Sequence, residues 1–180
     1  MEPEDFMRMY GFLADSRERF LGKFGEMGWD AIVTDRGGTW GSMLGIFLHA
    51  LDVEESWLHR EKKPWPEPSQ ALEAYIIREE EGGWEIDPLA FKDLEAVQAY
   101  HQGVMAKTRD LLEHLTSDTL REDYVLEWTD GRRKASMANI LMHAFVDELA
   151  HLGELDCLTW QLDIDPDWLS WLDLHDRAVK

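Results

Sequence analysis

The chain has 180 residues, of which 44% are hydrophobic, and 37 acidic residues outnumber 18 basic ones, so the formal net charge is −19. This length fits one domain, residues 1–180, with enough apolar side chains for a sizeable core. The negative charge argues against nucleic-acid binding, because that function depends on clustered Lys and Arg.

The single cysteine, Cys157, excludes an internal disulfide and a thiolate-rich zinc site, and one free thiol fits a reducing cytosol. It lies in an apolar helical run, so we expect a small core residue. The acidic N-terminus lacks the pattern of a secretory signal, and no uncharged apolar run reaches the ~18 residues that span a bilayer. We therefore expect a cytoplasmic protein that does not insert into membranes.

The first half of the chain predicts two long helices. Apolar residues recur at helical spacing over residues 4–27, and 30–38 reads as a connector that ends in a turn. A second helix begins near Thr39 or Ser42, either of which can cap it, and ends before Pro64. Residues 69–81 are expected to form a short helix or an irregular segment.

The second half predicts two more long helices. Asp87 and Pro88 together indicate a helix start, and that helix should reach about Leu115. Residues 124–128 alternate weakly before a turn at 129–132, which permits a small hairpin. The last long helix runs from about Ser136 to 162, and Pro166 opens a short C-terminal helix. Four amphipathic helices with a long segment between the second and third predict an all-α four-helix bundle with a crossover connection.

The most informative motif is His143, Asp147 and His151, three metal-capable side chains spaced four residues apart within an apolar stretch. Residues four apart lie on one face of a helix, and burying such groups unpaired is costly. A divalent metal ion would satisfy them. His49 lies midway along the second helix among apolar residues and can supply a ligand from there. Two imidazoles and one carboxylate leave open positions on the ion, as in catalytic sites.

Several alternatives remain open at this point. The ligand set suits zinc, iron, nickel or manganese. Glu148 can replace Asp147 by pairing with His151 three residues on, and His143 can be a ligand, a partner of a ligand or a general base. We expect Glu54 and its neighbour Glu55 to be solvated or to support the ligands. The remaining histidines lie in polar surroundings and are predicted to be on the surface: His59, His101, His114 and His175.

Two segments resemble the DinB/YfiT-like family of metalloenzymes. Residues 40–49, ending in His49, are similar to the family's second helix, and residues 141–154 resemble its pattern H-x3-H-E-x2-H-x-G-Q. The order and length of the helices agree over most of the chain. The chain departs from the pattern at Asp147, where many members have His, and at Glu154, where they have Gln. The related mycothiol-dependent maleylpyruvate isomerases carry a Glu at the place of Asp147, so an acidic ligand is tolerated.

The resemblance implies an up-down-down-up bundle, often a homodimer, with a divalent metal on His49, Asp147 and His151 and with His143 outside the triad. It also implies a metal-dependent thiol S-transferase that uses a low-molecular-weight thiol on a small electrophile. His143 is then the best candidate for a general base. Two alternatives are a metal-dependent hydrolase on the same site and a non-catalytic bundle with a degenerate site that binds a ligand or partner.

Overall fold

The computed structural model describes residues 1–37, 40–59, 76–78, 84–128 and 131–165. Its first helix, α1 (Pro3–Met27), has the predicted extent. Pro3 stands in the first turn, and the backbone N–H of Glu2 donates to the Asp5 carboxylate at 3.0 Å, which fixes the helix start. Part of the predicted connector is helical, since α2 (Trp29–Val33) follows directly. Its buried Ile32 joins the core, which explains why this short segment is ordered as a helix.

The helix that carries His49 is α3 (Met43–Leu58). Ser42 caps it by accepting a hydrogen bond from the Gly45 N–H at 3.0 Å, so the second of the two predicted start positions is the right one. Almost every residue of α3 is buried, and His49 is one of the few that are half-buried.

The start of the third long helix was predicted wrongly. Asp87 accepts a hydrogen bond from the Leu89 N–H at 2.9 Å, but this closes only a short 3-10 turn, η2 (Pro88–Ala90). The chain is then extended at Phe91, whose side chain is buried, and Asp93 caps α4 (Leu94–Glu113) through the Ala96 N–H. Burial of the phenyl ring therefore competes with continuation of the helix. Before η2, the strands β1 (Ile76–Arg78) and β2 (Trp84–Ile86) form an antiparallel pair. β1 lies within residues 69–81, which were predicted as a short helix or irregular, and β2 follows that segment.

The predicted hairpin and last long helix are both present. After a 3-10 turn, η3 (Thr119–Arg121), the strands β3 (Asp123–Trp128) and β4 (Gly131–Ser136) pair antiparallel with Asp123 opposite Ser136. Ser136 then caps α5 (Met137–Gln161) by accepting from the Asn139 N–H. The short helix expected at Pro166 lies outside the described residues.

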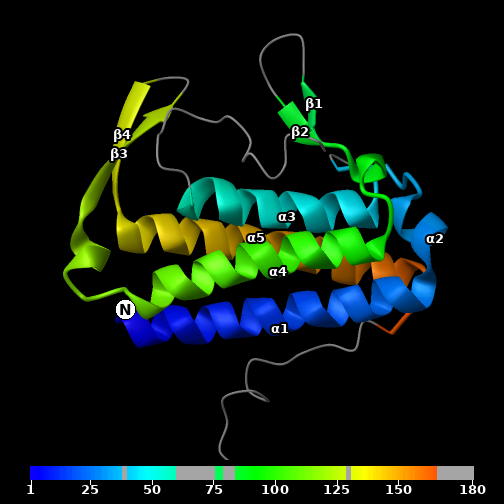
Figure 1. The fold of residues 1–180 in the computed structure, drawn as a ribbon, viewed down its shortest axis with the longest axis horizontal. Coiled ribbons are helices and arrows are strands. Elements are labelled where there is room, and N and C mark those ends of the chain that lie inside the picture. The colour runs from blue at the N-terminus through cyan, green and yellow to red at the C-terminus, as the bar shows by residue number, and fades with distance from the viewer. Residues whose placement is uncertain (38–39, 60–75, 79–83, 129–130, 166–180) are drawn as a thin grey trace, which may run out of the picture.

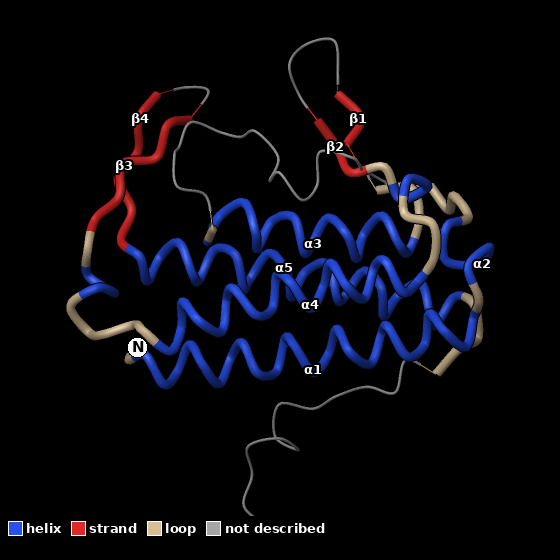
Figure 2. The backbone as a smooth tube through the Cα atoms, viewed as in Figure 1, coloured by secondary structure: helices blue, strands red, loops and turns tan. Residues whose placement is uncertain are grey.

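The four long helices form the predicted bundle (Figure 1). α1 and α5 run in one direction and α3 and α4 in the other, which is the up-down-down-up order. α3 packs most extensively on α5, and α1 packs on both α4 and α5. Both two-stranded hairpins extend from the same side of the helical body (Figure 2). None of the described helices is long and apolar enough to cross a membrane.

An aromatic core holds the helices together. The Tyr10 ring of α1 stacks on Phe145 of α5 with centroids 5.7 Å apart, and Phe24 meets Phe47 of α3 edge-on at 5.5 Å. Such pairs add to the stabilisation from apolar burial. On α5 the buried residues recur every three or four positions, so they form one face that packs into the bundle.

Candidate metal centre

The antiparallel packing of α3 on α5 brings His49 next to His151. Their rings lie edge to face with centroids 4.7 Å apart. Asp147, one turn before His151 on α5, points its carboxylate to the same place, and the two side chains approach to 3.4 Å between Nε2 and Oδ2. The structure thus places all three predicted ligands in one cluster, with one ligand atom from each within 4.8 Å of the others.

The donors of this cluster fit a divalent metal ion. Two ligands that each bind a tetrahedral zinc ion at about 2.1 Å lie roughly 3.4 Å apart, which is the separation between His151 and Asp147. His151 is 12% exposed and Asp147 is 34% exposed, so the cluster is open to small molecules and is not sealed in the core. Two nitrogens and one oxygen would leave coordination positions for water or substrate.

Trp40 covers one side of His49. Its ring stacks on the imidazole with centroids 3.4 Å apart and planes 16° from parallel, and it also meets His151 edge-on at 6.2 Å. The loop that holds Trp40 turns back at Gly41, whose φ of +66° is unfavourable for other residues, and the Ser42 N–H donates to the Trp40 carbonyl at 2.7 Å. At Gly45 a Cβ atom would collide with that carbonyl oxygen, so a glycine is needed for the loop to lie on α3.

His49 is neutral at physiological pH. Burial is the main cause, and the neighbouring His151 adds to it; together they lower the pKa of His49 to about 3. A metal ligand must be in its deprotonated form, so His49 is ready to bind over the whole physiological range.

Glu154 orients the second imidazole. Its Oε2 lies 3.1 Å from Nδ1 of His151, three residues earlier on α5. With Nδ1 donating to this carboxylate, Nε2 keeps its lone pair, and Nε2 is the nitrogen that faces Asp147. The family pattern had drawn attention to Glu154 only as a departure from Gln. The i, i+3 spacing on a helix is the signal that would have assigned it this contact.

Glu148, the alternative to Asp147, points away from the cluster into the core. It is fully buried, and its Oε1 lies 3.2 Å from Nε of Arg17 on α1. Burial and the charge of Glu54 raise the pKa of Glu148 to about 8, against the opposing effect of Arg17. The structure therefore favours Asp147 as the carboxylate of the cluster.

His143 lies outside the three-residue cluster. It is exposed, and its ring packs edge to face on Trp57 with centroids 4.4 Å apart. It stands one helical turn, roughly 6 Å, before Asp147 along α5. This position is compatible with the predicted role of a base beside the metal ligands.

Several side chains lie elsewhere than predicted. Of the two alternatives predicted for Glu54 and Glu55, the solvated one is wrong, because Glu54 is fully buried in an ion pair with Arg17 and Glu55 is buried as well. His101 on α4 is fully buried. His59 is half-buried, and its Nε2 lies 2.7 Å from the Thr108 hydroxyl. Cys157 is exposed instead of buried, because it falls between the buried positions of α5. His114 is exposed, as predicted, and His175 lies outside the described residues.

The comparison with protein families agrees with this geometry. No curated protein matches the chain significantly. The sequence model of one family, described as Mycothiol-S-transferase, matches residues 8–163. This span includes most of α1, the other three long helices and the cluster of His49, Asp147 and His151. Because the match covers well over half of the chain, the protein belongs to the Mycothiol-S-transferase family, a DinB-like family.

Proposed function

We propose that the protein is a metal-dependent thiol S-transferase in which His49, Asp147 and His151 hold a divalent ion. The observation that carries the proposal is the convergence of these three donors from two helices at a partly open place. Membership of the Mycothiol-S-transferase family supports a low-molecular-weight thiol as the co-substrate. When bound, such an ion supplies a positive charge that lowers the pKa of a thiol.

The surrounding residues would each have a separate task. Trp40 covers one face of His49, so it limits the side from which a thiol can approach. Glu154 holds the imidazole of His151 with its free lone pair toward Asp147. His143, exposed one turn before Asp147, accepts the proton that leaves the thiol.

The reaction balances without any other reactant. The thiol sulfur forms a bond to carbon of the electrophile, the leaving group departs with its electron pair, and the thiol proton goes to His143.

The homodimer that the family resemblance implies stays a prediction.

The test combines metal analysis with an S-transfer assay. The full chain is loaded with zinc, nickel, iron or manganese in turn and assayed with mycothiol and a fluorogenic halide. We expect one tightly bound ion per chain, with turnover that requires both the ion and the thiol. His49→Ala should lose the ion, whereas His143→Gln should keep it and lose rate. His114→Ala, at an exposed position at the end of α4, is the matched control and should behave like the wild type.

The outcomes separate the proposal from its alternatives. A bound ion with turnover in the absence of any thiol would favour a hydrolase. Failure of every divalent ion to bind, or to change the melting temperature, would overturn the metal-dependent mechanism and favour a non-catalytic bundle.

A further inference from the structure

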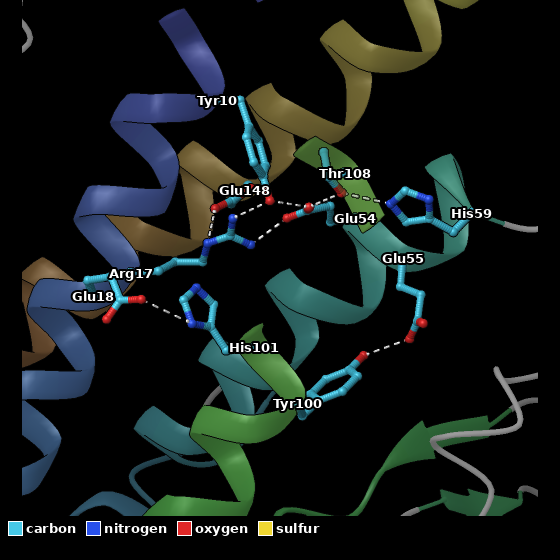
Figure 3. A network of polar contacts seen from close by, with 10 residues as sticks. All are labelled: Tyr10, Arg17, Glu18, Glu54, Glu55, His59, Tyr100, His101, Thr108 and Glu148. Atoms are coloured by element: carbon cyan, nitrogen blue, oxygen red, sulfur yellow. Dashed lines mark hydrogen bonds and ion pairs between the residues drawn. The ribbon is translucent and has the colours of Figure 1, made fainter. Parts of the chain in front are cut away.

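A buried arginine links three helices of the bundle. Arg17 of α1 is fully buried, its Nη1 pairs with Oε2 of Glu54 on α3, and its Nε lies 3.2 Å from Oε1 of Glu148 on α5 (Figure 3). Both carboxylates are also fully buried. The rigid, planar guanidinium therefore constrains where α3 and α5 lie relative to each other.

Further hydrogen bonds hold this cluster in place. The Tyr10 hydroxyl donates to Oε1 of Glu54 at 2.8 Å and accepts from Nη2 of Arg17 at 3.1 Å. The hydroxyl of Thr108 on α4 donates to the same Glu54 oxygen. These hydrogen bonds join α1, α3 and α4, and the close approach of Arg17 to Glu148 adds α5 to the same cluster (Figure 3).

The two carboxylates are close in sequence to the proposed metal ligands. Glu148 directly follows Asp147, and Glu54 lies five residues after His49. At about 100° per residue, Glu148 points about 100° from Asp147 around α5, and Glu54 points about 140° from His49 around α3. Each of the two helices therefore directs its carboxylate and its proposed ligand to different sides. Any rotation or sliding of α3 or α5 would therefore displace the ligands together with the buried carboxylates.

Stability alone does not explain why an arginine and two glutamates are buried together. Removing charges from water is costly, and well-packed apolar residues often replace a buried ion pair without loss of stability. Apolar contacts, however, tolerate small shifts between helices, whereas a directional polar contact fixes register. A metal site needs that precision, since its ligand distances must be correct to about 0.2 Å.

We propose that Arg17 is a positioning residue for the metal centre: by bridging Glu54 and Glu148 it sets the register of α3 against α5, and with it the distance from His49 to Asp147 and His151. The inference rests on the proposed function, because it requires these three side chains to bind an ion. It adds a residue on a third helix that touches none of them.

The main test is the variant Arg17→Met/Glu54→Gln/Glu148→Met. The glutamine keeps an oxygen for Tyr10 and Thr108, so the variant loses only the bridge and the hydrogen bond from Arg17 to the Tyr10 hydroxyl. Zn²⁺ affinity is measured by competition with a chelator, and the geometry is measured from the visible spectrum of the Co²⁺ form. We expect the metal-free variant to melt within a few degrees of the wild type. Its Zn²⁺ affinity should fall by about tenfold or more, with a changed Co²⁺ spectrum.

The matched control is Glu55→Gln/Lys107→Met. It removes a different ion pair, 2.5 Å between Lys107 Nζ and Glu55 Oε1, which joins α3 to α4 but does not reach α5. We expect its Zn²⁺ affinity to stay within twofold of the wild type. If the triple variant does not fold, Arg17→Lys decides the question, because the lysine keeps the charge but cannot bridge two carboxylates with a planar fork.

Three results would overturn the inference. One is a folded triple variant, or a folded Arg17→Lys variant, with wild-type Zn²⁺ affinity and Co²⁺ spectrum. Another is an equal loss of affinity in the control. The third is a wild-type protein that binds no divalent ion at all, and only this result would remove the proposed function as well.

Discussion

The substitution His101→Phe tests how a buried, unprotonated histidine affects acid stability. His101 on α4 is fully buried, 6.2 Å from the Phe47 ring between centroids, and its Nδ1 lies 3.6 Å from Glu18. Neither ring nitrogen makes a hydrogen bond among the described residues. Burial, with smaller effects of the positive charges of Arg17 and Arg109, lowers the pKa of His101 to about 3.

The sign and size of the effect follow from this pKa. The unfolded chain takes up a proton at His101 near pH 6.5, whereas the folded protein does so only near pH 3. Above pH 6.5, His101 therefore has no pH-dependent effect on the free energy of unfolding. As the pH falls from 6.5 toward 3, protonation of His101 in the unfolded chain lowers this free energy. Each pH unit in this window costs at most about 1.4 kcal/mol, so by pH 4.5 the loss amounts to roughly 2.5 kcal/mol.

Phenylalanine removes both the titration and two buried polar atoms that lack partners. At pH 7 we expect the free energy of unfolding of His101→Phe to equal or exceed that of the wild type by about 1 kcal/mol. At pH 4.5 the variant should be the more stable protein by roughly 2 to 4 kcal/mol.

The assay is urea unfolding of metal-free protein at pH 7.0, 6.0, 5.0 and 4.5, with the m-value checked at each pH. The other titratable groups are common to both proteins and cancel in the difference. The exposed variant His114→Phe serves as the control for replacing a histidine by an aromatic ring. Parallel stability curves for the wild type and His101→Phe between pH 6.5 and 4.5 would refute the reasoning.

Substitutions at three other positions probe the proposed metal centre and its support. Asp147→Asn replaces a charged proposed ligand with a neutral one at a position that is 34% exposed. Zn²⁺ affinity should therefore fall at least about tenfold with little change in melting temperature. Glu154→Ala should weaken Zn²⁺ binding severalfold, whereas Glu154→Gln should largely preserve it; equal affinities for all three proteins would contradict the orienting role. Gly45→Ala should destabilise the protein by about 1 to 3 kcal/mol in thermal unfolding, because the added Cβ displaces the loop that holds Trp40. The control is Gly103→Ala on α4, where the Cβ meets open space, and it should stabilise the protein by up to about 1 kcal/mol.

The long helices were predictable because their apolar residues repeat with helical spacing and their caps are recognisable. Ser42 and Ser136 both accept the expected backbone hydrogen bonds, and the helix boundaries follow from them. Asp87 also makes a capping bond, yet it starts only a short turn. The difference comes from Phe91, since the gain from burying its ring at that point depends on the packing of the whole bundle.

The ligand cluster was predictable in part. Asp147 and His151 share a helix face by spacing alone, and an inward-facing His49 on a packed neighbour completes the set. The stacking of Trp40 on His49 was not accessible in this way. It depends on a loop whose direction is set by a positive φ at Gly41 and by the close approach at Gly45, and these are properties of the folded backbone.

The buried charges offered a signal that the sequence interpretation did not use. Arg17 falls on the same helical face as Leu13 and Phe24, and Glu148 falls between the buried positions Phe145 and Leu152. Charged residues at core positions of different helices must meet one another, since each alone would be too costly to bury. The same reasoning that singled out the histidines applies to them, and it would have predicted contacts among helices far apart in sequence. Helix periodicity identifies the buried face, and the charges on that face then indicate which helices are neighbours.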